Sequence, residues 1–240
     1  SSYKKEIFNT FCETLGETAS IYFHVHHCEF ENFKTIINEN LNGYNYYVIM
    51  PHFNNFNFKK FNALMQKIKK EKIILLDEII PNFTHYNSCI YQDFKDDIFS
   101  ALNEAKQSLL KYKTLCLVFP KGFNYPYPTS IVQGFMFFCI INNIKSELIS
   151  QIHSLHKIKK NTAYIVVKES DLVNLIKNIR LSQLELAQEV GVLSYNDTPL
   201  KEILSNGISV ISTDFKAMGK TAAKTIIENK SVLQKNEFKF

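Results

Sequence analysis

Arginine is almost absent from this chain of 240 residues, which has a single one, Arg180. Lysine supplies nearly all of the positive charge, and the formal net charge is +5. Arginine is the usual bidentate reader of guanine in DNA, so the chain is poorly equipped to read bases itself. The densest lysine cluster, residues 67–72, is typical of a solvated helix end, with a phosphate-binding patch as the alternative.

Paired cysteine motifs and long apolar runs are also missing. The cysteines are scattered and form no CxxC pair, which argues against a zinc knuckle and against a disulfide framework. Free thiols are typical of a reducing compartment, so we expect a cytoplasmic protein. No apolar run reaches the roughly 18 residues of a membrane-spanning helix, and the amino end has no signal-peptide pattern. We therefore expect no membrane association.

Catalytic and metal-binding motifs are absent as well. The chain has no GxGxxG, Walker loop, nucleophile elbow or HExxH, and its carboxylates pair with no evident base. His24, His26 and His27 form an HxHH run, but only Cys28 lies nearby as a further ligand, so we predict no metal site. We expect no enzyme and no cofactor; an α/β enzyme of unrecognised type is a remaining alternative.

The pattern of apolar residues predicts alternating strands and helices, which is typical of α/β proteins with parallel sheets. The sequence contains two such runs, with a change near residues 91–94. The expected strands cover residues 19–26, 46–50, 72–76, 88–91, 113–119, 146–152, 163–167, 190–195 and 208–213, followed by an extended tail, 232–240. The expected helices cover residues 3–15, 29–41, 58–68, 94–112, 131–142, 171–180 and 215–230.

Polar side chains follow many of these strands, most clearly in the stretch 189–230. In open α/β sheets, ligands bind beyond the carboxyl ends of the strands. Amides and carboxylates bind the hydroxyls of a sugar-like ligand, and buried polar groups left unpaired reject the wrong one. Helix capping and turn formation are the alternative roles. The candidate ligand-binding residues are His52, Phe53, Asp77, Tyr91, Lys121, Lys168, Asn196, Asp197 and Asp214.

The last 50 residues also carry a specific resemblance. A strand ends in Tyr195-Asn196-Asp197, the next ends near Asp214, and the following helix has Met218-Gly219 with the small pair Ala222-Ala223. This order resembles the effector domain of the lactose-repressor/galactose-repressor family. It is most similar to effector domains attached to GntR-type winged-helix regulators of carbohydrate use in Bacteroidetes-like bacteria. Independently of the resemblance, the small residues around Gly219 predict close helix packing.

The resemblance implies a periplasmic-binding-protein-like type I fold. It has two Rossmann-like lobes with parallel sheets and a hinge of three crossings, expected near residues 91–93, 213–215 and 231–233. The first lobe takes in residues 1–91 plus 215–230, and the second 92–214 plus 231–240. A small sugar or sugar derivative is expected to bind between the lobes.

The resemblance also implies partners and residue roles. Asp77, Asn196 and Asp197 fall at positions that contact the effector, and a lysine at position 168 favours an anionic ligand. The family forms homodimers, and the aromatic-rich first lobe is a candidate for the dimer surface. The expected function is that of a ligand-sensing domain in a transcription regulator. The alternative is an extracytoplasmic sugar-binding protein of a transporter, which would need a signal peptide or a lipobox cysteine.

Two features depart from the family pattern. The family's first apolar strand is missing before residue 3, and no winged-helix or helix-turn-helix pattern precedes it. We therefore expect contact with operator DNA only through an N-terminal winged-helix domain that this chain lacks.

Overall fold

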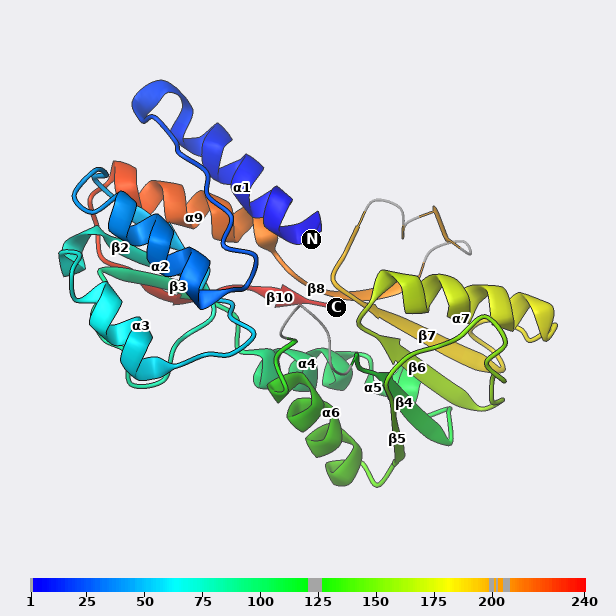
Figure 1. The fold of residues 1–240 in the computed structure, drawn as a ribbon. Coiled ribbons are helices and arrows are strands. Elements are labelled where there is room, and N and C mark those ends of the chain that lie inside the picture. The colour runs from blue at the N-terminus through cyan, green and yellow to red at the C-terminus, as the bar shows by residue number, and fades with distance from the viewer. Residues whose placement is uncertain (1, 121–126, 199–200, 202, 205–207) are drawn as a thin grey trace. The chain divides into compact units, whose positions relative to one another are not determined.

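The computed structural model describes residues 2–120, 127–198, 201, 203–204 and 208–240. These residues divide into two compact units (Figure 1). The first contains residues 2–93 and 214–237, and the second contains residues 94–120, the described part of 127–213, and 238–240. Asp214 and residues 231–237, which the sequence placed in the second lobe, thus lie in the first unit. The third crossing falls after Glu237 rather than near residue 232.

A parallel sheet of four strands forms the centre of the first unit, in the order β1-β2-β3-β9. The strands are β1 (Tyr47–Ile49), β2 (Ile73–Asp77), β3 (Ser88–Tyr91) and β9 (Leu233–Lys235). Strand β9 pairs with β3, which explains why this part of the tail belongs here. All five residues of β2 are buried, as expected for a strand covered on both faces.

Four helices cover the two faces of this sheet: α1 (Ser2–Leu15), α2 (Phe30–Glu39), α3 (Phe58–Met65) and α9 (Phe215–Ile227). Helices α1 and α9 share a buried cluster with Ile74 and Leu76 of β2. Helices α2 and α3 share another with Ile73 and Leu75, which point to the opposite face. Two 3-10 turns, Gly16–Thr18 and Lys70–Lys72, complete the unit.

Gly219 allows α1 and α9 to approach closely. A Cβ atom at this position would lie 2.4 Å from the carbonyl oxygen of Ile7 in α1, far inside van der Waals contact. The predicted role of Gly219 in close helix packing is confirmed.

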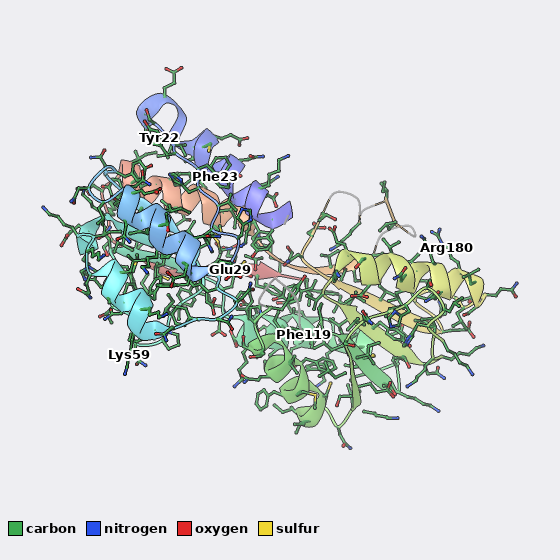
Figure 2. The ribbon with its side chains drawn as sticks, in the orientation of Figure 1. Tyr22, Phe23, Glu29, Lys59, Phe119 and Arg180 are labelled. Carbon is green, nitrogen blue, oxygen red and sulfur yellow. The ribbon has the colours of Figure 1, made fainter. Side chains whose placement is uncertain are left out.

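Residues 19–26, expected as a strand, form an extended segment that joins neither sheet. The prediction was wrong because alternation of side chains does not supply a partner for the backbone. The side chains contact their neighbours instead: the Tyr22 ring stacks on Tyr44 with a centroid distance of 5.3 Å, and Phe23 packs against Phe8. Tyr22 and Phe23 both lie on the outside of the first unit (Figure 2).

The second unit is built on a sheet of six strands in the order β10-β8-β7-β6-β4-β5. All neighbours are parallel except β10, which pairs antiparallel with β8. The strands are β4 (Thr114–Val118), β5 (Lys145–Ile149), β6 (Thr162–Val166), β7 (Val190–Tyr195), β8 (Ser209–Thr213) and β10 (Phe238–Lys239).

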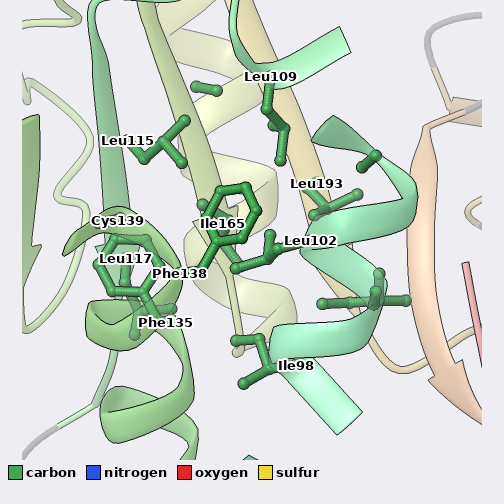
Figure 3. Packing of buried hydrophobic residues seen from close by; sticks show 14 of the residues in the cluster. Ile98, Leu102, Leu109, Leu115, Leu117, Phe135, Phe138, Cys139, Ile165 and Leu193 are labelled. Carbon is green, nitrogen blue, oxygen red and sulfur yellow. The ribbon is translucent and has the colours of Figure 1, made fainter. Parts of the chain in front are cut away.

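Helices pack on both faces of this second sheet: α4 (Phe94–Glu104), α5 (Lys106–Leu109), α6 (Ser130–Ile141) and α7 (Glu169–Leu181). The helix expected over 94–112 is two helices, because it is interrupted at Ala105, where ψ is −1°. Leu117 and Ile165 join the core on the side of α4 and α6 (Figure 3). Val118 and Val166 join the core beneath α7. Together the two sheets give the α/β fold that the sequence predicted.

Candidate functional site

A sharp turn follows strand β7 at the carboxyl edge of the second sheet. Asn196 has a φ of 61°, a left-handed conformation that asparagine adopts more readily than most residues. Its N–H donates to the carbonyl of Ile211 in β8 at 2.8 Å, and the N–H of Asp197 donates to Ser212 Oγ at 3.0 Å. The turn is therefore fixed to the neighbouring strand, and it carries two of the predicted ligand-binding residues side by side.

The side-chain amide oxygen of Asn196 makes no hydrogen bond to any described residue. Its Oδ1 atom is buried and has no hydrogen-bond partner among the described residues. Most buried polar atoms in proteins are hydrogen-bonded, so an exception requires an explanation. The carboxylate of Asp197, by contrast, belongs to an exposed residue. The turn thus offers an amide oxygen and a carboxylate, both suited to accept hydrogen bonds from hydroxyl groups.

Lys201 makes hydrogen bonds to the backbone of this turn and was not among the predicted residues. The residue is only 3% exposed, and its Nζ atom donates to the carbonyl oxygens of Tyr195, at 3.1 Å, and of Asn196. Burial lowers the pKa of the Lys201 ammonium, although the charges of Glu169 and Asp197 partly oppose that shift. No periodic pattern distinguishes Lys201 from the chain's many exposed lysines, so its burial could not be predicted from the sequence.

Lys168 lies at the end of the adjacent strand β6 and begins α7. It belongs to the same edge as Asn196 and is exposed to solvent. Lys121, the other lysine on the predicted list, lies outside the described residues.

A buried cluster centred on Asp77 occupies the carboxyl edge of the first sheet. Asp77 ends strand β2 with a φ of 79° and is completely buried. Its Oδ2 atom accepts hydrogen bonds from Tyr3 Oη at 3.0 Å and from His52 Nε2 at 2.9 Å. Its Oδ1 atom accepts one from Gln92 Nε2. Protein donors thus engage both carboxylate oxygens.

The electrostatics of this cluster favour an ionised carboxylate. Burial alone would raise the pKa of Asp77, but the charge and hydrogen bond of His52 outweigh it, helped by Gln92 and Tyr3. The pKa is therefore lowered. Glu78, the next residue, has its pKa raised by burial, with His52 opposing the shift. The pKa values of these two adjacent carboxyls are thus shifted in opposite directions by their surroundings.

The remaining predicted residues of the first unit have distinct surroundings. Phe53 is 5% exposed and packs in the core beside Phe33 and Phe61. Tyr91 pairs with Asp77 in register at the strand ends and is half-buried. Asp214 caps α9, since its Oδ1 accepts the N–H of Ala217 at 2.8 Å. The capping role that competed with ligand contact at Asp214 is therefore present.

The structure thus brings together two separate sets among the predicted residues. His52 and Asp77 are in contact in the first unit, and Asn196 and Asp197 share a turn in the second. Tyr3 and Gln92 were missed. Gln92 directly follows Tyr91 at a strand end, which was a usable signal, whereas nothing in the pattern of helix α1 singles out Tyr3.

The HxHH run makes hydrogen bonds within the protein. His24 Nε2 lies 3.0 Å from Tyr44 Oη, and His26 Nε2 lies 3.2 Å from the carbonyl oxygen of Met50. Burial lowers the pKa of His26. Within the described part of the chain, no group of three or more His, Cys, Asp or Glu side chains is placed to hold a metal ion. The helices described there are all too short or too polar to cross a membrane.

Comparisons with known proteins identify the fold. A family model described as "Periplasmic binding protein-like domain" matches residues 140–236. Among solved structures, a dimeric Lac repressor with a C-terminal deletion is similar at a TM-score of 0.73 and 13% identity, covering 99% of this chain and 93% of that one. A LacI transcriptional regulator from Lactobacillus brevis is similar at 0.71 and 12% identity, covering 99% and 95%.

A third similar structure is the probable maltose operon transcriptional repressor from Staphylococcus aureus, with a TM-score of 0.71 and 14% identity over 100% of this chain and 90% of that one. No curated protein sequence matches the chain. At these identities the likeness establishes a periplasmic-binding-protein-like α/β fold, and function has to be argued from the site.

Proposed function

We propose that this chain is the ligand-sensing domain of a bacterial transcription regulator and that it binds a small sugar or sugar derivative. The buried Oδ1 atom of Asn196 carries the proposal, because it has no partner among the described residues and lies at the edge where α/β sheets bind ligands. A ligand hydroxyl donating to this atom would satisfy it. The fold shared with several repressors supports the regulatory role.

The ligand chemistry follows from the groups at the two sheet edges. The side chains of Asn196 and Asp197 can accept hydrogen bonds from ligand hydroxyls. The exposed ammonium of Lys168 favours a ligand with a negative charge, such as a sugar phosphate or sugar acid. On the first unit we propose His52, Tyr91 and Asp214 as further contacts. Asp77 already accepts from three protein donors, so we assign it mainly to orienting His52. Phe53 and Lys121 remain on the predicted list of contacts.

Regulation of transcription requires contact with DNA and, in our proposal, a second subunit. We propose a cytoplasmic homodimer whose DNA contacts come from a separate N-terminal winged-helix domain of GntR type, as in regulators of carbohydrate use in Bacteroidetes-like bacteria. The ligand would act by its unequal affinity for two conformations of the protein, since equal affinity shifts no equilibrium.

A ligand screen with a paired variant tests the binding proposal. Thermal shift and calorimetry are run with pentoses, deoxyhexoses and their phosphates. Glycine tolerates a positive φ, so Asn196→Gly removes the amide without straining the turn. We expect a ligand to bind the natural protein and Asn196→Gly to weaken it about 10–100-fold, the effect of one lost buried hydrogen bond.

Asn161→Gly is the matched control, because Asn161 also has a positive φ, of 55°, and lies just before the amino end of β6 in the same unit. It should bind the ligand normally. Flat calorimetry with every saccharide, or equal weakening in both variants, would contradict the proposal.

The family description also fits an extracytoplasmic sugar-binding protein of a transporter. DNA binding distinguishes the two proposed functions. The full-length gene product should retard its own promoter region in a gel-shift assay and lose that activity, or gain it, when the identified ligand is added. A product that binds the sugar but never binds DNA would favour the transporter function.

A further inference from the structure

The chain passes between the two units three times within the described residues, at residues 93–94, 213–214 and 237–238. The second and third of these crossings are bonded to each other. Thr213 pairs antiparallel with Phe238, and the N–H of Asp214 donates to the carbonyl oxygen of Glu237 at 2.9 Å. These two crossings therefore form a two-stranded ribbon.

Asn236 joins the first crossing to this ribbon. Its backbone N–H donates to the carbonyl oxygen of Tyr91 at 2.7 Å, two residues before the first crossing. Its side-chain Nδ2 donates to the carbonyl oxygen of Asp214 at 2.8 Å and to that of Glu237 at 3.3 Å. A single residue thus makes hydrogen bonds to the segments of all three crossings.

The orientation of the Asn236 amide supports a linking role. The residue is 3% exposed, and its Oδ1 atom is buried with no hydrogen-bond partner among the described residues. Turning the amide over would place Oδ1 against two carbonyl oxygens and remove both bonds that Nδ2 donates. A buried oxygen without a partner is costly, and an apolar side chain would avoid that cost. The two donated bonds therefore account for an asparagine at this position.

We propose that Asn236 is a positioning residue that fastens the three crossings to one another. Any change of conformation that reorients one unit against the other has to bend the chain at all three crossings. Crossings that are bonded to one residue bend together, whereas separate crossings fluctuate independently. The proposal goes beyond the ligand-binding function and does not depend on it, because its test requires no ligand.

Amide exchange in the natural protein and in Asn236→Ala measures the fastening. Alanine keeps the backbone N–H of residue 236 and removes the side-chain amide. We expect exchange at Asp214 and at residue 236 to quicken about five- to tenfold, the effect of roughly one lost hydrogen bond.

Asn178→Ala is the matched control for the loss of a buried amide. Asn178 is also 3% exposed, and its Nδ2 donates to the carbonyl oxygen of His153 at 2.8 Å, within the second unit alone. This variant should leave exchange at Asp214 unchanged.

A second measurement separates fastening from local packing. Nitroxide labels are attached at Lys59→Cys in α3 and Arg180→Cys in α7, two exposed positions in different units (Figure 2). The substitutions Cys12→Ser and Cys28→Ser remove the partly exposed natural thiols. Pulsed electron paramagnetic resonance then gives the distribution of distances between the two labels. We expect Asn236→Ala to broaden this distribution relative to the labelled parent protein, and the control variant to leave its width unchanged.

Three results would overturn the fastening role of Asn236. They are unchanged exchange at Asp214 in Asn236→Ala, equal quickening in Asn178→Ala, or faster exchange with no broadening of the distances, which would limit Asn236 to local packing. If Asn236→Ala does not fold, Asn236→Ser takes its place. The serine hydroxyl can donate to only one of the two carbonyls, so exchange at Asp214 should quicken by a smaller factor, and exchange as slow as in the natural protein would refute the proposal.

Discussion

His52 donates from Nε2 to Oδ2 of Asp77 across 2.9 Å, and both side chains are almost fully buried. The pair lies at the carboxyl edge of the first sheet, where β2 ends in the left-handed conformation of Asp77. With Tyr3 and Gln92 it ties helix α1 and the residue after β3 to the same carboxylate. The ionised carboxylate therefore holds together segments far apart in the sequence.

Replacing Asp77 by asparagine is expected to destabilise the protein by about 3 kcal/mol, because removing one partner of a buried pair leaves the other uncompensated. Asparagine tolerates a positive φ, so backbone strain does not contribute. Urea unfolding measures the change. The exposed pair Lys230–Glu228 offers a control: Glu228→Gln should leave the unfolding midpoint unchanged. A loss in Asp77→Asn no larger than in the control would contradict the role of the buried pair.

The same pair predicts the response to acid. The pKa of Asp77 is lower in the folded protein than in the unfolded chain, so the unfolded chain binds more protons between the two values, and stability rises with pH there. The contribution is complete above the usual carboxyl pKa of about 4 and is lost as pH falls through the lower folded value. Unfolding free energies measured from pH 5 downward should fall less steeply in Asp77→Asn. Parallel curves for the two proteins would refute the assignment.

The α/β class and most of its elements could be predicted because the regular spacing of apolar residues along the chain indicates which side chains are buried. Strand β7 begins and ends where the pattern said, and the polar turn after it lies where the ligand site was expected. The sheet that the C-terminal tail joins was harder to predict. Strand β9 has the sequence Leu-Gln-Lys and is exposed, so no apolar pattern indicated its partner. Residues 19–26 show the converse, a strand-like alternation with no strand to pair with.

Side-chain partners at the site were less predictable than the elements that carry them. Asp77 was expected to face a ligand, but the sequence does not show that Tyr3 and Gln92 reach the same carboxylate. Lys201 is the clearest example, because a buried lysine and an exposed one have the same signature in a chain rich in lysine. Buried polar contacts depend on tertiary packing that local patterns do not encode.

Gly219→Ala is expected to destabilise the first unit by about 1–3 kcal/mol. The added methyl group would meet the backbone oxygen of Ile7 at 2.4 Å, and backbone cannot move aside as a flexible side chain can, so α1 and α9 must separate. Thermal unfolding measures the loss. Lys220→Ala, at the exposed neighbouring position, should cost nothing, and an equally stable Gly219→Ala would show that the helices are less closely packed than described.

Thiol labelling is expected to divide the cysteines into two groups. Burial raises the pKa of Cys89 and of Cys116 to about 12 and that of Cys139 to about 11, and the thiolate is the reactive form. Cys12 and Cys28 are partly exposed. Mass spectrometry after brief treatment of the native protein at pH 8 should find label on these two alone, with all five labelled in urea. Rapid native labelling of Cys116 would contradict the buried core of the second unit.

Lys201→Met should loosen the turn that presents Asn196 and Asp197. The ammonium donates to two successive carbonyls, and methionine fills the space without a donor. We expect amide exchange at Asn196 and Asp197 to quicken about tenfold, the loss of roughly one hydrogen bond, while exchange elsewhere in β6 stays slow. Lys168→Met, at the exposed end of the adjacent strand, should leave both amides protected.

Because burial lowers the pKa of Lys201 in the folded state, the unfolded chain binds more protons just below pH 10.4. The free energy of unfolding should therefore rise with pH in that window. That rise should be absent in Lys201→Met, and its persistence would mean that another group titrates there.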